Sequence, residues 1–329
     1  MKKAFFSFSA LLFLLLFVSC AKGKSLTLNM AESNSIDSPA AHVDQIFIDK
    51  VAELSKGSIK INLQANGIFG NNAIVTEAMT KPDCEIHLAR ISPASLIQYD
   101  CSKSSLLMVP FTFSNRKHFW AFASSSAANE ILNEPYEKGI GVKGLFFSEE
   151  GFRHFFSTSR IKDINDFSGK KIRITNNEIM LGIAKSLKSE AVNIGFNELY
   201  AALQTGRVDI AEQPIVNYLS SHFNKVAPYM ILDRHILGVT EVVISSKVWD
   251  SLSKKQKNIF YEAAEYAREY CQTISYKTEE EAKETLRKEG VEFIDVTDIT
   301  PWQNVCADVI NRAVASDPTL YGEILTLAE

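Results

Sequence analysis

Along the first 100 residues, segments with alternating apolar and polar positions take turns with segments of helical periodicity. Residues 25–30 and 59–63 alternate regularly enough to predict two strands. Between them, Pro39 opens an amphipathic pattern with apolar side chains at helical spacing. A second predicted helix at 71–80 and a strand at 85–89 follow. This βαβαβ order predicts a parallel sheet with helices over its faces.

The pattern is interrupted and then begins again in the middle of the chain. Residues 106–113 are apolar, but Pro110 favours the end of a strand over a central strand. After Gly151 the alternation of strands and helices restarts, which predicts a second lobe. The elements predicted around this restart are a helix at 115–132, strands at 142–147, 153–157, 171–175, 191–193 and 208–211, and helices at 179–187 and 197–204.

The C-terminal third contains a long helical pattern. Residues 253–288 keep helical periodicity without a glycine or a proline. At about 1.5 Å per residue this helix would be roughly 50 Å long, which exceeds the length of one lobe. We therefore expect it to lie across both lobes. Two extended segments before it, 229–235 and 240–245, are expected to cross back toward the first lobe.

The N-terminus has the pattern of an export signal. Two lysines precede an apolar stretch at 4–18, and Cys20 follows a small residue. This predicts a secretory signal peptide at 1–19. A cysteine at the cleavage point also predicts lipidation of Cys20, with residues 20–24 as a tether; an ordinary signal with an incidental cysteine is the alternative. Acyl chains would anchor the protein to a membrane without spanning it, so we expect an exported, periplasmic lipoprotein.

Composition narrows the function classes. The chain of 329 residues has a formal net charge of −4, and this mild acidity argues against nucleic-acid binding, which needs a basic face. Its length exceeds what one core usually supports, so we assign lobe I to 25–150 and about 239–278, and lobe II to 151–238 and about 279–329. No metal-ligand cluster or nucleotide loop occurs in the sequence, so we expect neither a metal nor a cofactor.

Two of the cysteines leave a choice open. Cys84 and Cys101 would form a disulfide if their segments are neighbours, and buried free thiols are the alternative.

The densest group of charged and polar residues is the segment 166–173, with the sequence DFSGKKIR. Gly169 is expected in a turn that begins a strand, with Arg173 near the carboxyl end of that strand. Ligands of open α/β sheets bind beyond these strand ends. An arginine there can hold a carboxylate through two parallel hydrogen bonds. A surface or interlobe ion pair is the alternative role for this arginine.

This segment, residues 196–209 (FNELYAALQTGRVD) and the turn Glu212-Gln213-Pro214 together resemble the substrate-binding proteins of tripartite ATP-independent periplasmic (TRAP) transporters. Residues 109–113 (VPFTF) and 151–153 (GFR) match the family in the same order. The resemblance implies an α/β, two-lobed periplasmic-binding-protein-like fold with a long helix spanning both lobes. It also implies a receptor and not an enzyme.

The resemblance further implies roles for particular residues. Arg173 would hold a ligand carboxylate, and Arg153 would assist it. Gln213 stands where the family commonly has an asparagine, which moves the side-chain amide by one methylene. The other residues expected at the ligand site are Glu212, Phe196, Tyr200 and His235, with His42 and Arg90 as candidate contacts from the first lobe.

The ligand and the partners follow from the same resemblance. Aromatic residues near the expected cleft allow either an organic acid or a hydrophobic carboxylate with an apolar body. The implied partners are TRAP membrane permease subunits driven by an ion gradient, and a periplasmic helical-repeat (tetratricopeptide-type) protein is a further candidate. Glu212 beside Arg173 keeps an enzyme on the same scaffold as an alternative, and a sensor that has lost its pocket is a third reading.

Overall fold

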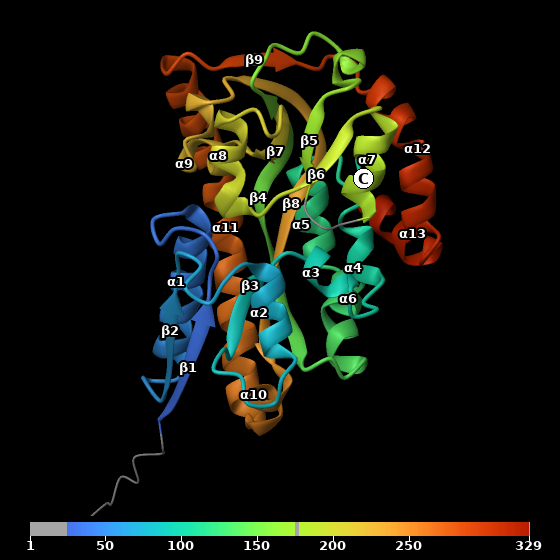
Figure 1. Ribbon diagram of the computed structural model, residues 1–329. Helices are drawn as coiled ribbons and strands as arrows, with labels where there is room; N and C mark the ends of the chain where they lie inside the picture. Colours follow the sequence, from blue (N-terminus) through green and yellow to red (C-terminus); the bar gives the residue numbers. More distant parts are fainter. Residues whose placement is uncertain (1–24, 175–177, 329) are drawn as a thin grey trace, which may run out of the picture.

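Residues 25–174 and 178–328 of the computed structural model form one mixed sheet of nine strands with helices on both faces (Figure 1). The predicted signal peptide, Cys20 and the tether lie outside these described residues. The strands are β1 Leu26–Ala31, β2 Ile59–Gln64, β3 Leu88–Ile91, β4 Val142–Ser157, β5 Lys171–Ile174, β6 Glu190–Asn193, β7 Ile210–Pro214, β8 Tyr229–Ser245 and β9 Glu292–Asp295. Their order is β2-β1-β3-β8-β4-β7-β5-β6, and β9 pairs with β8.

The helices complete the two lobes. They are α1 Pro39–Leu54, α2 Asn72–Met79, α3 Ala94–Ile97, α4 Lys103–Leu106, α5 Arg116–Ala123, α6 Ser126–Glu137, α7 Glu178–Ser186, α8 Leu199–Gln204, α9 Ile215–Ser220, α10 Ser246–Ser251, α11 Lys254–Lys288, α12 Thr300–Val314 and α13 Pro318–Thr326. We call the part built on β1–β3 and α1–α6 lobe I, and the part built on β5–β7, β9, α7–α9 and α12 lobe II.

The sheet is parallel at its two ends and antiparallel in the middle. The strands β2, β1 and β3 pair in parallel in lobe I, as do β7, β5 and β6 in lobe II. The two long strands β4 and β8 pair antiparallel from Val142↔Ser245 to Ser157↔Tyr229 and so run through both lobes. The predicted parallel sheet is therefore confirmed within each lobe, and the two predicted crossing segments, 229–235 and 240–245, form the single strand β8.

The break that the sequence predicts after Gly151 does not occur, because β4 is one continuous strand. The sequence predicts two strands here, but β4 continues from lobe I into lobe II with a shift of register between Glu149 and Phe152. Gly151 has a φ of 98°, and a Cβ at this position would lie 2.9 Å from Glu279 Oε2. Glycine therefore permits the local irregularity without ending the strand.

The long helix α11 spans both lobes, as predicted. Ser253 caps it, and a reciprocal contact with Gln256 completes a capping box. The buried side of α11 includes Phe260, Ala263 and Ala267. Most of its buried residues are small, so the helix packs closely on β4. It contacts α1 in lobe I and α9 in lobe II (Figure 1).

Other segments differ from the sequence prediction. Residues 106–113 form no strand, because Pro110 lacks a donor and Phe111 has a φ of 62°. The helix predicted at 115–132 is two helices, α5 and α6, and Ser125 caps the second. The C-terminal α13 packs on lobe I, since Leu320 and Ile324 belong to its core. That packing differs from the predicted assignment of 279–329 to lobe II; the remaining lobe boundaries stay a prediction.

Cysteines and membrane spans add two further observations. Cys84 and Cys101 are both free thiols and do not form the disulfide that the sequence left open.

Within the described residues, no helix combines the length and the apolar character that crossing a bilayer requires.

Candidate functional site

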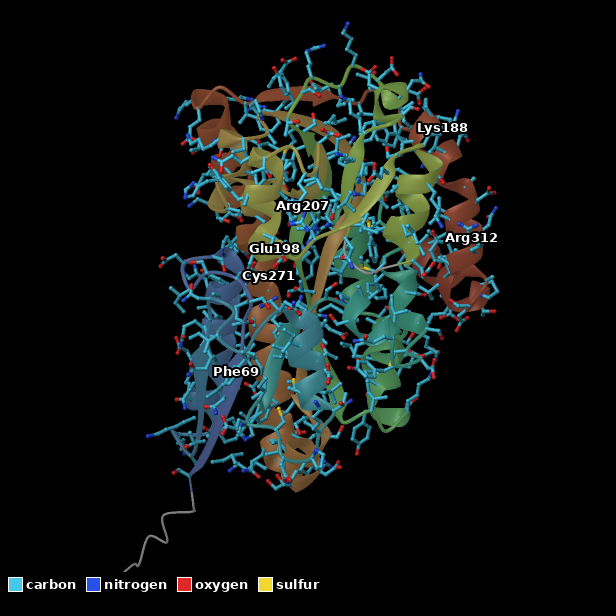
Figure 2. All side chains as sticks on the ribbon, in the orientation of Figure 1. Phe69, Lys188, Glu198, Arg207, Cys271 and Arg312 are labelled. Atoms are coloured by element: carbon cyan, nitrogen blue, oxygen red, sulfur yellow. The ribbon has the colours of Figure 1, made fainter. Side chains whose placement is uncertain are left out.

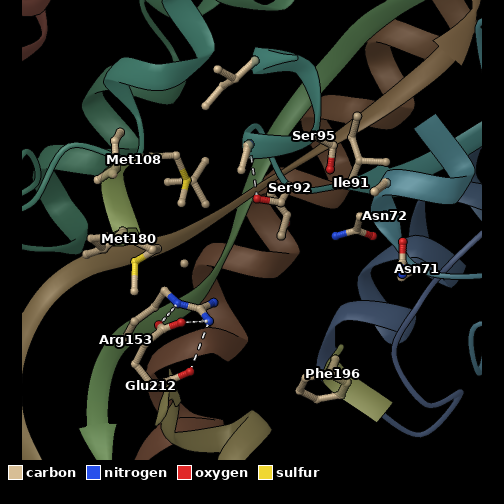
Figure 3. Close-up of a pocket in the computed structure, with 18 of the residues that line it drawn as sticks. Asn71, Asn72, Ile91, Ser92, Ser95, Met108, Arg153, Met180, Phe196 and Glu212 are labelled. Atoms are coloured by element: carbon tan, nitrogen blue, oxygen red, sulfur yellow. Dashed lines mark hydrogen bonds and ion pairs between the residues drawn. The ribbon is translucent and has the colours of Figure 1, made fainter. Parts of the chain in front are cut away.

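A cleft of about 1160 Å³ lies between the two lobes. Lobe I contributes the carboxyl ends of β1 and β3 and the start of α2, and lobe II contributes β5, β7, α7 and α12. Strand ends from both lobes therefore meet at one place, as expected for ligand sites of open α/β sheets. Figure 3 shows a close-up of this cleft.

Arg173 reaches the cleft because β5 alternates. Ile172 and Ile174 point into the lobe II core, so Arg173 lies on the opposite side of the strand. Asp209 fixes the start of β5: its Oδ2 accepts a hydrogen bond of 2.8 Å from the backbone N–H of Lys171. The pattern that predicted a strand with an arginine near its end is thus confirmed in the local structure.

Arg173 is a buried cation that has no ion-pair partner among the described residues. The residue is 3 % exposed, and its Nε donates a hydrogen bond of 3.0 Å to the backbone carbonyl of Ile194. Among the described residues, no carboxylate forms an ion pair with it. Burial lowers the pKa of Arg173 to about 10; Glu212 raises it in part, and Arg153 lowers it further. A buried, uncompensated guanidinium is costly, and an anionic ligand would relieve that cost.

Arg153 and Glu212 form an ion pair beside Arg173. They stand on the neighbouring strands β4 and β7. Arg153 donates from Nε and Nη2 to the two carboxylate oxygens of Glu212, the second at 2.9 Å, and Figure 3 shows this pair in the cleft wall. Burial alone would raise the pKa of Glu212, but Arg153 and His235 lower it to about 2. Glu212 therefore stays ionised and is ion-paired with Arg153. A carboxylate with so low a pKa is a weak base, so Glu212 is disfavoured as a general base.

His235 lies behind this pair and not in the cleft wall. Its Nδ1 is 2.6 Å from Asp233 Oδ2, its Nε2 is 3.8 Å from Glu212 Oε2, and its ring stacks on Phe155 at 4.3 Å. The residue is 1 % exposed. Burial would lower the pKa of His235, but Asp233 and Glu212 raise it to about 9. The predicted ligand contact is corrected: His235 is a buried partner of the acids on β8 and β7.

The other predicted residues divide between wall and core. Gln213 and Phe196 line the cleft; Gln213 is buried and Phe196 is 38 % exposed. Tyr200 does not line the cleft, because it packs with the core beneath α8. The structure therefore brings together Arg173, Arg153, Glu212, Gln213 and Phe196, and leaves Tyr200 and His235 outside the wall.

Sequence reasoning missed the lobe I wall. Asn71, Asn72, Ser92 and Ser95 line the cleft and lie across from the Arg153–Glu212 pair in Figure 3. Ser92 comes directly after β3, and Asn71 caps the start of α2, so a strand end and a helix start were the available signals. Arg90, the expected lobe I contact, lines the cleft but is bound to Glu32 and Asp44.

Comparisons with known proteins agree with this geometry. The model of the bacterial extracellular solute-binding proteins, family 7 (DctP), matches residues 30–317. The sialic acid-binding periplasmic protein SiaP of Vibrio cholerae is 26 % identical over 278 residues, which cover 84 % of this chain and 85 % of SiaP.

Solved structures show the same fold. A TRAP periplasmic solute-binding protein from Xanthobacter autotrophicus Py2, with bound β-D-galacturonate, superimposes with a TM-score of 0.85 at 25 % identity, covering 92 % of this chain and 99 % of that one. The sugar acid-binding protein DctPAm of Advenella mimigardefordensis, in complex with galactonate, has a TM-score of 0.84 at 25 % identity and covers 93 % of this chain and 98 % of its own.

These comparisons also decide between the classes of function. The family consists of substrate-binding receptors and not of enzymes. The two-lobed fold with a shared long helix, predicted from the sequence, is confirmed. The chain belongs to the bacterial extracellular solute-binding proteins of family 7, the receptors of TRAP transporters.

Proposed function

We propose that this receptor captures a small sugar acid in the cleft and that Arg173 holds the ligand carboxylate. The observation that carries the proposal is the buried guanidinium of Arg173, which has no ion-pair partner among the described residues. Its neighbour Arg153 is already paired with Glu212. A carboxylate that entered the cleft would supply the missing charge and accept charge-assisted hydrogen bonds.

The choice of a sugar acid rests on the opposite wall and on the relatives. The amides of Asn71 and Asn72 and the hydroxyls of Ser92 and Ser95 suit a ligand rich in hydroxyl groups. The related receptors from X. autotrophicus and A. mimigardefordensis hold β-D-galacturonate and galactonate. These ligands do not favour the alternative of a carboxylate with an apolar body.

Ligand capture would proceed by closure of the lobes around β4 and β8. Both strands run through the two lobes, so small changes in their middle can rotate one lobe against the other. Contacts made with both lobes at once favour the closed form and shift the population toward it. In this scheme, Arg173 supplies the contact from lobe II, and Asn71, Asn72 and Ser92 supply those from lobe I.

The receptor would then deliver its ligand to the membrane permease subunits of a TRAP transporter. We also propose that Cys20, which lies outside the described residues, is lipidated and holds the receptor at the membrane. A helical-repeat protein of the periplasm is a further proposed partner. Intact-mass measurement of the exported protein tests the anchor: acyl chains on an N-terminal Cys20 support it, and a plain N-terminus contradicts it.

Isothermal titration calorimetry with D-galacturonate, D-glucuronate and galactonate tests the ligand site. We expect saturable binding of at least one of them, and a loss of at least a hundredfold (about 2.7 kcal/mol) in Arg173→Ala. Arg207→Ala is the matched control, because Arg207 lies on the surface near α8 and its side chain is 57 % exposed (Figure 2). Equal affinity of Arg173→Ala and the wild type would show that Arg173 does not hold the ligand.

A further inference from the structure

Two of the four arginines that line the cleft already have buried acid partners. Arg153 is paired with Glu212, and Arg90 with Glu32 and Asp44. The pairing of Arg90 uses all of its nitrogens: Nε lies 3.2 Å from Glu32 Oε2, Nη2 donates to Asp44, and Nη1 donates to hydroxyls.

The cluster formed by Arg90, Glu32 and Asp44 carries no net positive charge. Its two acids are buried with it, at 3 % and 0 % exposure for Glu32 and Asp44. Burial raises the pKa of both carboxyls, and their mutual repulsion raises that of Glu32 further. One proton held between the two acids makes the cluster neutral, and loss of that proton makes it negative. In neither state does Arg90 offer a free charge to a ligand.

A further carboxylate, that of Glu150, belongs to the cleft wall. Glu150 lies where β4 crosses between the lobes. Its Oε1 accepts from Asn34 Nδ2 at 3.0 Å in lobe I, and its Oε2 accepts from Asn217 Nδ2 at 3.1 Å in lobe II. Both donors are neutral amides, so they orient the negative charge without cancelling it. A ligand group that extends away from Arg173 therefore meets an acid and neutral side chains.

The remaining charges are at the rim. Glu178 and Lys185 on α7 and Arg312 on α12 also line the cleft, but all three side chains are exposed, and Figure 2 shows Arg312 on the outer edge of the molecule. Water and salt screen charges in such positions. The three residues outside the described ranges within the chain, 175–177, are Thr, Asn and Asn and carry no ionisable side chain. Arg173 is thus the only buried guanidinium of the described cleft wall without an acid partner.

We propose that the cleft admits ligands with one anionic group and discriminates against diacids of the same skeleton, with Glu150 and the Arg90 cluster as the specificity determinants. This inference rests on the proposed function, because it assumes that Arg173 holds the first carboxylate. A second carboxylate would lose its hydration against neutral amides and hydroxyls, and would be repelled by Glu150. An uncharged group at the same place would lose little hydration free energy and would not be repelled by Glu150.

Matched ligand pairs provide the test. D-gluconate and D-glucarate share an open-chain six-carbon hydroxylated skeleton and differ in having one or two carboxylates; galactonate and galactarate form a second pair. Calorimetric titration of the purified receptor at pH 7.5 is expected to show binding of the monoacids. Each diacid is expected to bind at least about thirtyfold more weakly than its monoacid partner.

Two variants locate the discrimination. Glu150→Gln removes the negative charge while keeping the shape, and we expect the monoacid-to-diacid affinity ratio to fall about fivefold. The double variant Glu32→Gln, Asp44→Asn frees Arg90 as a second cation, and a gain of diacid binding is expected. Because this variant changes a buried cluster, its fold is checked by circular dichroism. Glu178→Gln is the control: it removes an acid at the exposed rim and should leave the ratio within twofold.

The outcomes separate the two proposals. Diacid binding equal to or tighter than monoacid binding in the wild type overturns the single-charge inference and leaves the carboxylate receptor standing. An unchanged ratio in Glu150→Gln overturns the role of Glu150. Failure of every acid in both series to bind overturns the proposed function together with this inference.

Discussion

Two arginines, Arg90 in lobe I and Arg173 in lobe II, line the same cleft and are equally buried, at 4 % and 3 % exposure. Their surroundings differ. Arg90 is held by two carboxylates and two hydroxyls, and the acids raise its pKa although burial opposes them. Arg173 has no acid of its own among the described residues, and burial lowers its pKa to about 10. Burial in a cleft therefore does not identify a ligand-binding arginine, whereas the lack of an acid partner among the described residues does.

The largest expected effect comes from removing the arginine that is paired. Arg90→Ala leaves Glu32 and Asp44 buried without a cation, so we expect the free energy of unfolding to fall by about 3–5 kcal/mol. Urea denaturation measures it. The control is Arg160→Ala, since the exposed pair of Arg160 with Glu292 should contribute less than about 1 kcal/mol. If Arg90→Ala is as stable as the control, then the Arg90 cluster is not what holds this part of lobe I together.

A second effect of intermediate size concerns the acids and histidine behind Arg153. The pKa of His235 is raised from 6.5 to about 9, so its ion pairs with Asp233 and Glu212 stabilise the fold fully below pH 6.5 and less as the pH rises through 9. We expect the stability difference between wild type and His235→Gln to shrink by about 2–3 kcal/mol from pH 6 to pH 10. Urea denaturation at several pH values measures it. A difference that stays constant over this range would mean that His235 is neutral throughout.

The smallest expected effect has the opposite sign to the first. Arg173→Met removes a buried charge that has no ion-pair partner among the described residues, so the ligand-free receptor should become more stable, by about 1–2 kcal/mol. Thermal unfolding without ligand measures this, and a sugar acid should then stabilise only the wild type. A marked loss of stability in ligand-free Arg173→Met would mean that Arg173 serves the fold, as Arg90 does.

Much of this comparison was accessible from the sequence, and part of it was not. Periodicity located α1 and α11, and the position of Arg173 near a strand end indicated the site. Whether a given arginine is paired depends on residues far away in the chain: Asp44 and Arg90 are brought together only by the packing of α1 on the sheet. No local pattern predicts such a contact.

The remaining differences have similar causes. The continuation of β4 past Gly151 depends on pairing with β8, which compensates for a residue that usually interrupts a strand. Tyr200 and His235 carry polar groups suited to a ligand, but Tyr200 packs against the core from helix α8, and His235 is buried on strand β8. Asn71 and Ser92 were missed because single polar residues after a strand are too common to stand out.

A crystal structure of the receptor with the sugar acid that binds it most tightly would show which arginine holds the ligand. We expect the ligand carboxylate to lie within hydrogen-bonding distance, about 3 Å, of the terminal nitrogens of Arg173, and Arg90 to keep its bonds to Glu32 and Asp44. A carboxylate bound elsewhere in the cleft, with no contact to Arg173, would show that Arg173 is not the ligand-binding arginine.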